Sequence, residues 1–87
     1  MAKEHTAHSR EKIKTKVINM IAENTEMDKN TISEEAVFNQ DIVLDSLSFA
    51  EMLMECEEAF DIEIPMEDAA NFKTVKDLID YLVSKHT

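Results

Sequence analysis

The chain contains no glycine and a single proline, Pro65, in 87 residues. Tight hairpin turns depend on residues that adopt positive φ, which glycine does at the lowest cost, so turn-dense β structure is disfavoured. Alanine, methionine, leucine, glutamate and lysine, which favour helices, are plentiful instead. The sequence therefore predicts an all-α fold, and its length allows one small domain.

The spacing of apolar residues predicts a small four-helix bundle with three longer helices and one short helix. The expected helices cover about residues 9–23, Ser46 to Phe60, residues 66–71 after Pro65, and a last segment that follows the cap residue Thr74. A long loop over residues 24–44 joins the first two helices. Residues 1–8 have no apolar period and are expected to form a loose tail, which leaves residues 9–87 as the single domain.

The start of the second helix presents a serine. Asp45 is a good N-cap residue, which makes Ser46 the first residue of the helix. Backbone N–H groups at this position lack intrahelical partners, and the helix dipole favours a negative group there. A phosphate attached to Ser46 would therefore suit this position.

The second helix carries two apolar stripes. The first has the spacing of a core-facing stripe and consists of Phe49, Met52, Leu53, Cys56 and Phe60. The second lies on a neighbouring face and consists of Leu47, Ala50 and Met54, with Glu51, Glu57 and Glu58 among them. An apolar strip rimmed by carboxylates is typical of a docking surface. Coverage of this strip by the short third helix is the alternative.

Charge and composition exclude several functions. The net charge of −10 argues against binding to nucleic acid and favours basic protein partners. Cys56 is the only cysteine and no apolar run is long enough to span a membrane, so a soluble, cytoplasmic protein is expected. No histidine lies between His8 and His86 to activate Ser46 as a catalytic nucleophile, and without glycine no EF-hand loop exists. We therefore expect neither an enzyme nor a metal site.

These features converge on a known family. The segment Asp45-Ser46-Leu47, followed by an acidic helix and by Ile64-Pro65, strongly resembles the acyl carrier proteins, in an order that extends from Ile13 to Leu82. The resemblance implies that Ser46 accepts 4′-phosphopantetheine from coenzyme A through a partner phosphopantetheinyl transferase, as a phosphodiester. The thiol of that group would hold acyl intermediates as thioesters for fatty acid or related, polyketide-like biosynthesis.

The resemblance also implies partners. Acyl synthases and transferases with basic docking patches are expected to contact a monomeric carrier, which performs no chemistry itself. The residues implied in this docking are Leu47, Ala50, Glu51, Met54, Glu57 and Glu58.

Two residues depart from the family pattern. Val43 stands where the family commonly has glycine, and a positive φ there would strain valine, so we expect the loop to take another path. Phe49 replaces a smaller, often polar residue and is expected to fill part of the space for an acyl chain. Both changes favour a specialised carrier. An aminoacyl or D-alanyl carrier, and an acidic interaction module whose Ser46 is never modified, remain as alternatives.

Overall fold

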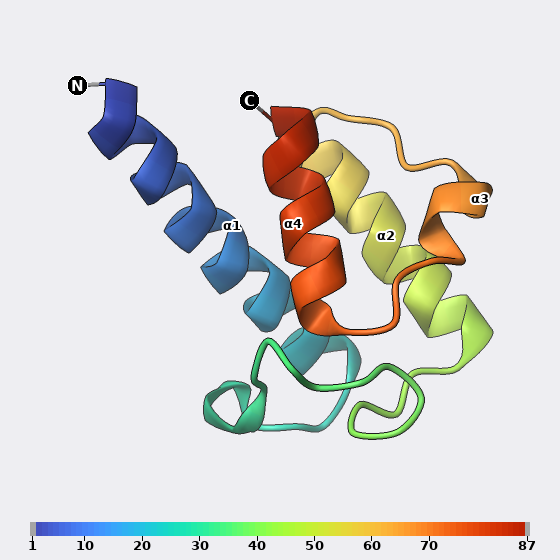
Figure 1. Ribbon diagram of the computed structural model, residues 1–87. Helices are drawn as coiled ribbons and strands as arrows, with labels where there is room; N and C mark the ends of the chain where they lie inside the picture. The colour runs from blue at the N-terminus through green and yellow to red at the C-terminus, as the bar shows by residue number, and fades with distance from the viewer. Residues whose placement is uncertain (1, 87) are drawn as a thin grey trace.

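The computed structural model describes the backbone of residues 2–86 and the side chains of residues 10–85. Its elements are α1 (Ala2–Asn24), the 3-10 helix η1 (Lys29–Thr31), α2 (Ser46–Phe60), α3 (Met66–Ala69) and α4 (Val75–His86). Figure 1 shows the three long helices side by side, with α1 running opposite to α2 and α4, and the short α3 beside α2. Within the described residues, β structure is limited to two isolated bridges. The predicted four-helix bundle with one short helix is confirmed.

The core lies where the three long helices meet. Their buried side chains repeat at intervals of three and four residues, which places them on one face of each helix. These side chains are Ile13, Val17 and Ile21 on α1, Met52, Leu53, Cys56 and Phe60 on α2, and Val75, Leu78, Ile79 and Leu82 on α4. The helices therefore pack through their apolar stripes. No helix in the described part of the chain is long and apolar enough to cross a membrane.

Helix α1 begins earlier than the apolar pattern indicates. We predicted its start at about Ser9, whereas the structure begins the helix at Ala2. The added residues include Ala2, Lys3 and Glu4, which are good helix formers, and extending an existing helix adds one hydrogen bond for each residue fixed. The expected loose tail is therefore helical from Ala2, while Met1 lies outside the described residues. The division of the chain at residue 8 into tail and domain stays a prediction.

The loop between α1 and α2 is fixed to the core by buried apolar side chains and backbone hydrogen bonds. The buried side chains are Ile32, Ala36, Phe38, Ile42 and Leu44. The Phe38 N–H donates to the Lys73 carbonyl at 2.9 Å, and the Val75 N–H donates to the Ala36 carbonyl at 3.1 Å. The loop therefore lies against the start of α4 before it enters α2.

Side-chain contacts hold α3 in place. The Tyr81 hydroxyl on α4 donates to Asp68 Oδ2 at 2.8 Å, and the Tyr81 ring lies 5.1 Å from the Phe72 ring in an edge-to-face arrangement. Burial, together with the Asp68 carboxylate, raises the pKa of Tyr81 to about 12. On the other side, the Ile64 N–H donates to Glu57 Oε2 at 2.7 Å. The segment that contains α3 is therefore tied to α4 through Asp68 and to α2 through Ile64, which precedes the helix.

Cys56 is a buried core residue. Its side chain is fully buried on α2, and its Sγ lies 3.5 Å from Met20 Sδ. Burial, reinforced by Glu55 and Glu57, raises the pKa of the thiol to about 12. Because the thiolate is the reactive form, Cys56 is inert in the folded protein.

Candidate functional site

Ser46 is the exposed first residue of α2, directly after the residue that caps this helix. Asp45 has extended backbone geometry, and its Oδ1 accepts a hydrogen bond from the Ser48 N–H at 2.8 Å. The Asp45 carbonyl accepts the first intrahelical bond, from the Phe49 N–H at 2.9 Å. The cap therefore fixes the helix start, and Ser46 lies exposed directly after it.

The electrostatics around Ser46 refine the expected phosphate site. Hydrogen bonds from the Ser48 backbone and side chain hold the pKa of Asp45 below its usual value, with a further contribution from the Leu47 backbone. The Ser48 N–H is thus already occupied by Asp45 and is not available to a phosphate on Ser46. The helix dipole still favours a negative group there, and an exposed hydroxyl fits such an attachment.

The Asp45 cap predicts an acid-sensitive contribution to folding. A carboxyl whose pKa is lowered in the folded state stabilises the fold above its unfolded pKa, which for aspartate is about 3.9, and loses that contribution as the pH falls through the lower folded pKa. We expect Asp45→Asn, whose amide oxygen still accepts from Ser48, to be less stable than wild type at neutral pH. The difference in free energy of unfolding between this variant and wild type should decrease below about pH 4, where wild type loses the contribution of the Asp45 carboxylate.

Urea denaturation between pH 7 and pH 2 measures this effect. The matched control is Glu58→Gln, which removes one negative charge from an exposed position of the same helix. Its difference in free energy of unfolding from wild type should not decrease in the same way. A deficit of Asp45→Asn that stays constant across this range would contradict the assigned cap.

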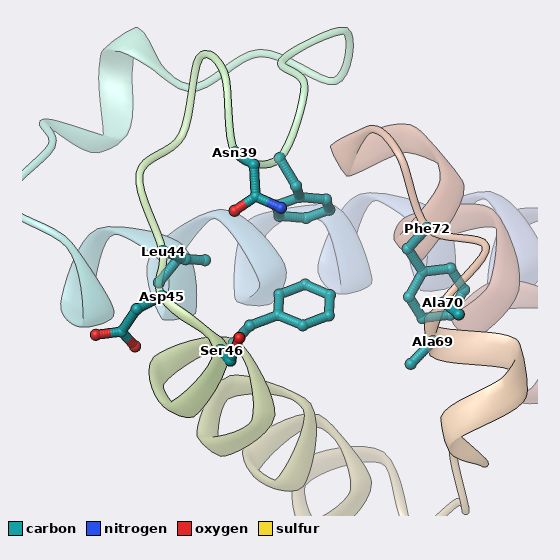
Figure 2. A pocket seen from close by; sticks show the side chains of 9 residues that line it. Asn39, Leu44, Asp45, Ser46, Ala69, Ala70 and Phe72 are labelled. Atoms are coloured by element: carbon teal, nitrogen blue, oxygen red, sulfur yellow. The ribbon is translucent and has the colours of Figure 1, made fainter.

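A first cavity of about 200 Å³ lies beside Ser46. It is bounded by residues from the loop, the start of α2 and the end of α3: Phe38, Asn39, Leu44, Asp45, Ser46, Phe49, Ala69, Ala70 and Phe72. Figure 2 shows Asn39 on the loop, Ser46 at the helix start and Phe72 on the opposite side, so segments distant in sequence meet around one space. Asn39 gives this cavity a partly polar wall, whereas the Asp45 carboxylate points away from the space (Figure 2).

A second cavity of about 210 Å³ lies between α2 and α3 and is also bounded by Ser46. Its other lining residues are Phe49, Ala50, Leu53, Met66, Ala69 and Ala70. Apart from Ser46, all of these side chains are apolar. Phe49, which we assigned to the core-facing stripe, is only half-buried and lines both cavities, because it lies at the solvent-facing end of that stripe.

The loop that enters the site avoids the strain considered for Val43. Among the described residues, positive φ occurs at Asn39 and Asp61, and Val43 is not one of them. The Val43 side chain is 81% exposed, while the next residue, Leu44, is buried. Asn39, which tolerates the left-handed region better than a β-branched residue, makes the turn four residues before Val43.

The six residues expected in docking do not share one environment. Leu47 and Met54 are 69% and 58% exposed, and Glu51 and Glu58 are exposed as well. Ala50 is half-buried and lines the apolar cavity. Glu57 is half-buried, and its carboxylate accepts a hydrogen bond from the Ile64 N–H. This bond joins α2 to the segment that leads into α3.

The structure exposes two further apolar side chains whose exposure the sequence analysis did not predict. Met66 at the start of α3 is 76% exposed, and Val43 in the loop is exposed as well. Neither belongs to a periodic stripe, so the apolar spacing gave no indication of their exposure. Among the described residues, no group of His, Cys, Asp and Glu side chains is arranged to hold a metal ion.

The chain is similar in sequence to a known protein family and to several of its members. A family described as "Phosphopantetheine attachment site" matches residues 15–82. The chain is 46% identical over 70 residues to an acyl carrier protein from Syntrophobacter fumaroxidans, covering 80% of this chain and 86% of that protein. It is 40% identical over 78 residues to an acyl carrier protein from Rubrobacter xylanophilus, covering 90% and 96%.

A solved structure supports the same similarity. The fold superposes on an acyl carrier protein from Enterococcus faecalis with a TM-score of 0.76 at 32% identity, covering 87% of this chain and 96% of that one.

Proposed function

Since the chain belongs to the acyl carrier protein family, whose cofactor is 4′-phosphopantetheine, we propose that Ser46 is the attachment site of that group. The chain then holds acyl intermediates for fatty acid biosynthesis or a related, specialised pathway. The observation that carries this proposal is the exposed Ser46, which lies at the start of the helix that Asp45 caps and borders two cavities. The monomeric, cytoplasmic state expected from the sequence is part of the same proposal.

The attachment step needs a partner enzyme. Ser46 Oγ bonds to the pantetheine-side phosphorus of coenzyme A, the bond from that phosphorus to the bridging oxygen of the pyrophosphate breaks, and adenosine 3′,5′-bisphosphate leaves. The hydroxyl proton passes to a base of the phosphopantetheinyl transferase, since the sequence has no histidine between His8 and His86. Once attached, the group supplies a terminal thiol that binds acyl chains as thioesters. The role of this chain is therefore to present the attached group to partner enzymes and to protect the acyl chain that it carries.

Partner enzymes are proposed to dock on the face that surrounds Ser46. Leu47 and Met54 offer exposed apolar surface, while Glu51 and Glu58 give it negative charge. Basic patches on a transferase or synthase complement such a face, and charges at the rim of an interface mainly speed and orient the encounter. That suits a carrier which must also dissociate quickly.

Reversal of the charge at Glu51 should slow attachment. We expect Glu51→Lys to lower kcat/KM for phosphopantetheinyl transfer about tenfold at low salt, because the complementary charge that steers the transferase is reversed. Glu11→Lys on α1 changes the net charge equally and is the matched control. The difference between the variants should fall as salt shortens the screening length. Equal slowing by both variants would instead indicate an effect of net charge alone.

The proposed function is tested by incubating the wild-type chain with coenzyme A and a broad-specificity phosphopantetheinyl transferase. Intact mass spectrometry should show the gain of one phosphopantetheine group. An unchanged mass would refute the carrier function and favour the interaction module. Parallel loading with acyl- and aminoacyl-activating enzymes then separates the cargo classes, and we expect acyl groups to be accepted, because the cavity between α2 and α3 is lined by apolar side chains.

A further inference from the structure

Phe49 occupies a distinctive position among the residues around Ser46. Four residues line both cavities: Ser46, Phe49, Ala69 and Ala70. Ser46 lies at the helix start, and the two alanines on the opposite side have small side chains. Phe49 therefore contributes the only bulky side chain to the wall that the two cavities share.

The orientation of the Phe49 ring is fixed by a neighbour. Its centroid lies 5.3 Å from that of Phe38, and the ring planes are inclined at 66°, which is the edge-to-face arrangement that aromatic pairs prefer. Phe38 is itself buried in the core. The buried Phe38 ring therefore supports one side of the Phe49 ring, and Phe49 lines both cavities.

The two spaces separated by Phe49 differ in chemistry. Ala50, Leu53 and Met66 complete the cavity between α2 and α3, so its wall beyond Ser46 is apolar. Asn39 contributes a polar side chain to the other cavity (Figure 2). An acyl chain carried near Ser46 therefore gains more by entering the space between α2 and α3.

The size of that space limits the chain. An apolar cavity of about 150 Å³ accommodates benzene, so a space of about 210 Å³ has room for roughly eight carbon atoms. A longer chain would need to pass Phe49 into the first cavity, and the ring blocks that path. Carbons beyond this length would stay in contact with water.

We propose that Phe49 is a specificity-determining residue that restricts the buried cargo of this carrier to acyl chains of roughly eight carbons. The inference rests on the proposed attachment of the carrying group to Ser46. It explains why a large aromatic side chain occupies a half-buried position beside the attachment site. Removing the ring should join the two cavities and admit a longer chain.

The test compares chains of different length on the same protein. Coenzyme A analogues with butanoyl, octanoyl or hexadecanoyl groups, joined by an amide in place of the thioester, are loaded with a phosphopantetheinyl transferase, and loading is verified by intact mass. Urea denaturation then gives the ratio of folded to unfolded protein. From butanoyl to octanoyl we expect this ratio to rise by up to about fourfold for each methylene, as apolar surface is buried. From octanoyl to hexadecanoyl the wild-type ratio should change by less than about twofold, since those added methylenes stay exposed.

Variants show whether Phe49 sets the limit. In Phe49→Ala the ratio of folded to unfolded protein should be at least about tenfold higher for the hexadecanoyl form than for the octanoyl form. Phe72→Ala is the matched control, because Phe72 lines only the first cavity and the substitution leaves Phe49 in place. Phe72→Ala should lower the free energy of unfolding, but its folded-to-unfolded ratio should change as little as that of wild type from octanoyl to hexadecanoyl.

The outcomes separate this inference from the function on which it rests. A wild-type protein that gains no mass would overturn the proposed function and this inference together. A second outcome overturns the inference alone. In it, the wild-type protein loads normally, but its ratio of folded to unfolded protein is at least about tenfold higher with hexadecanoyl than with octanoyl. That comparison needs no variant, so it holds even if Phe49→Ala fails to fold.

Discussion

Replacement of Ser46 by alanine is expected to abolish the mass gain that coenzyme A and a phosphopantetheinyl transferase produce on the wild-type chain. The reaction forms a bond between the phosphorus and an exposed hydroxyl oxygen, and Ser46→Ala removes that atom while leaving the Asp45 cap in place. Alanine is also the best helix former, so α2 should remain intact. Loss of loading with an unchanged circular dichroism spectrum is therefore the predicted pair of results.

Ser48 provides a matched control for this substitution. It lies two residues further along α2, and its backbone N–H, which alanine retains, donates to Asp45. Ser48→Ala should consequently load to completion. If Ser46→Ala still gained mass, another residue would carry the group and the assigned site would be wrong. If both variants failed to load, the geometry of the helix start would be responsible.

Truncation of Leu82 to alanine is expected to have the largest effect on stability among the substitutions discussed. Leu82 is fully buried on α4 among the side chains of the central core. Leucine-to-alanine changes in cores cost about 2–5 kcal/mol, from lost burial and from the cavity left behind. A small domain has only about 5–15 kcal/mol to lose. Urea denaturation should therefore show a midpoint shifted strongly to lower urea.

Leu47 tests the same change of side chain on the surface. Because its side chain is 69% exposed, Leu47→Ala should change the free energy of unfolding by less than about 0.5 kcal/mol. The same variant should slow attachment by the transferase if Leu47 contributes to docking. Equal destabilisation by the two leucine variants would contradict the packing described for α1, α2 and α4.

Local sequence signals were sufficient to predict α2, the helix that carries the candidate site. Asp45 supplies a capping side chain before a run of helix formers, and Pro65 restricts the chain soon after Phe60. The predicted limits of this helix, Ser46 to Phe60, agree with the structure. A start without such a marker, as in α1, was placed too late by the apolar pattern.

The absence of glycine left open where the chain makes its left-handed turns. The structure uses Asn39 in the loop and Asp61 at the end of α2, with φ values of 71° and 55°. Asparagine and aspartate tolerate this region best after glycine. The chain has several of each, however, and only the tertiary packing selects these two.

Two contacts of the α2 residues depend on tertiary structure. Glu57 was predicted as a docking residue from its helix face, yet its carboxylate accepts the Ile64 N–H at 2.7 Å. The contact between the Phe38 and Phe49 rings likewise joins the loop to α2. Neither pairing follows from periodicity, because each depends on how a loop folds back onto the helix.

Localisation of the added mass tests the central claim most directly. The wild-type chain is treated with coenzyme A and a phosphopantetheinyl transferase, and the product is fragmented in a tandem mass spectrometer. The account predicts one phosphopantetheine group per chain, carried by the fragment that contains Ser46 and by no fragment that lacks it. An unmodified chain, or a group found on any other residue, would contradict it.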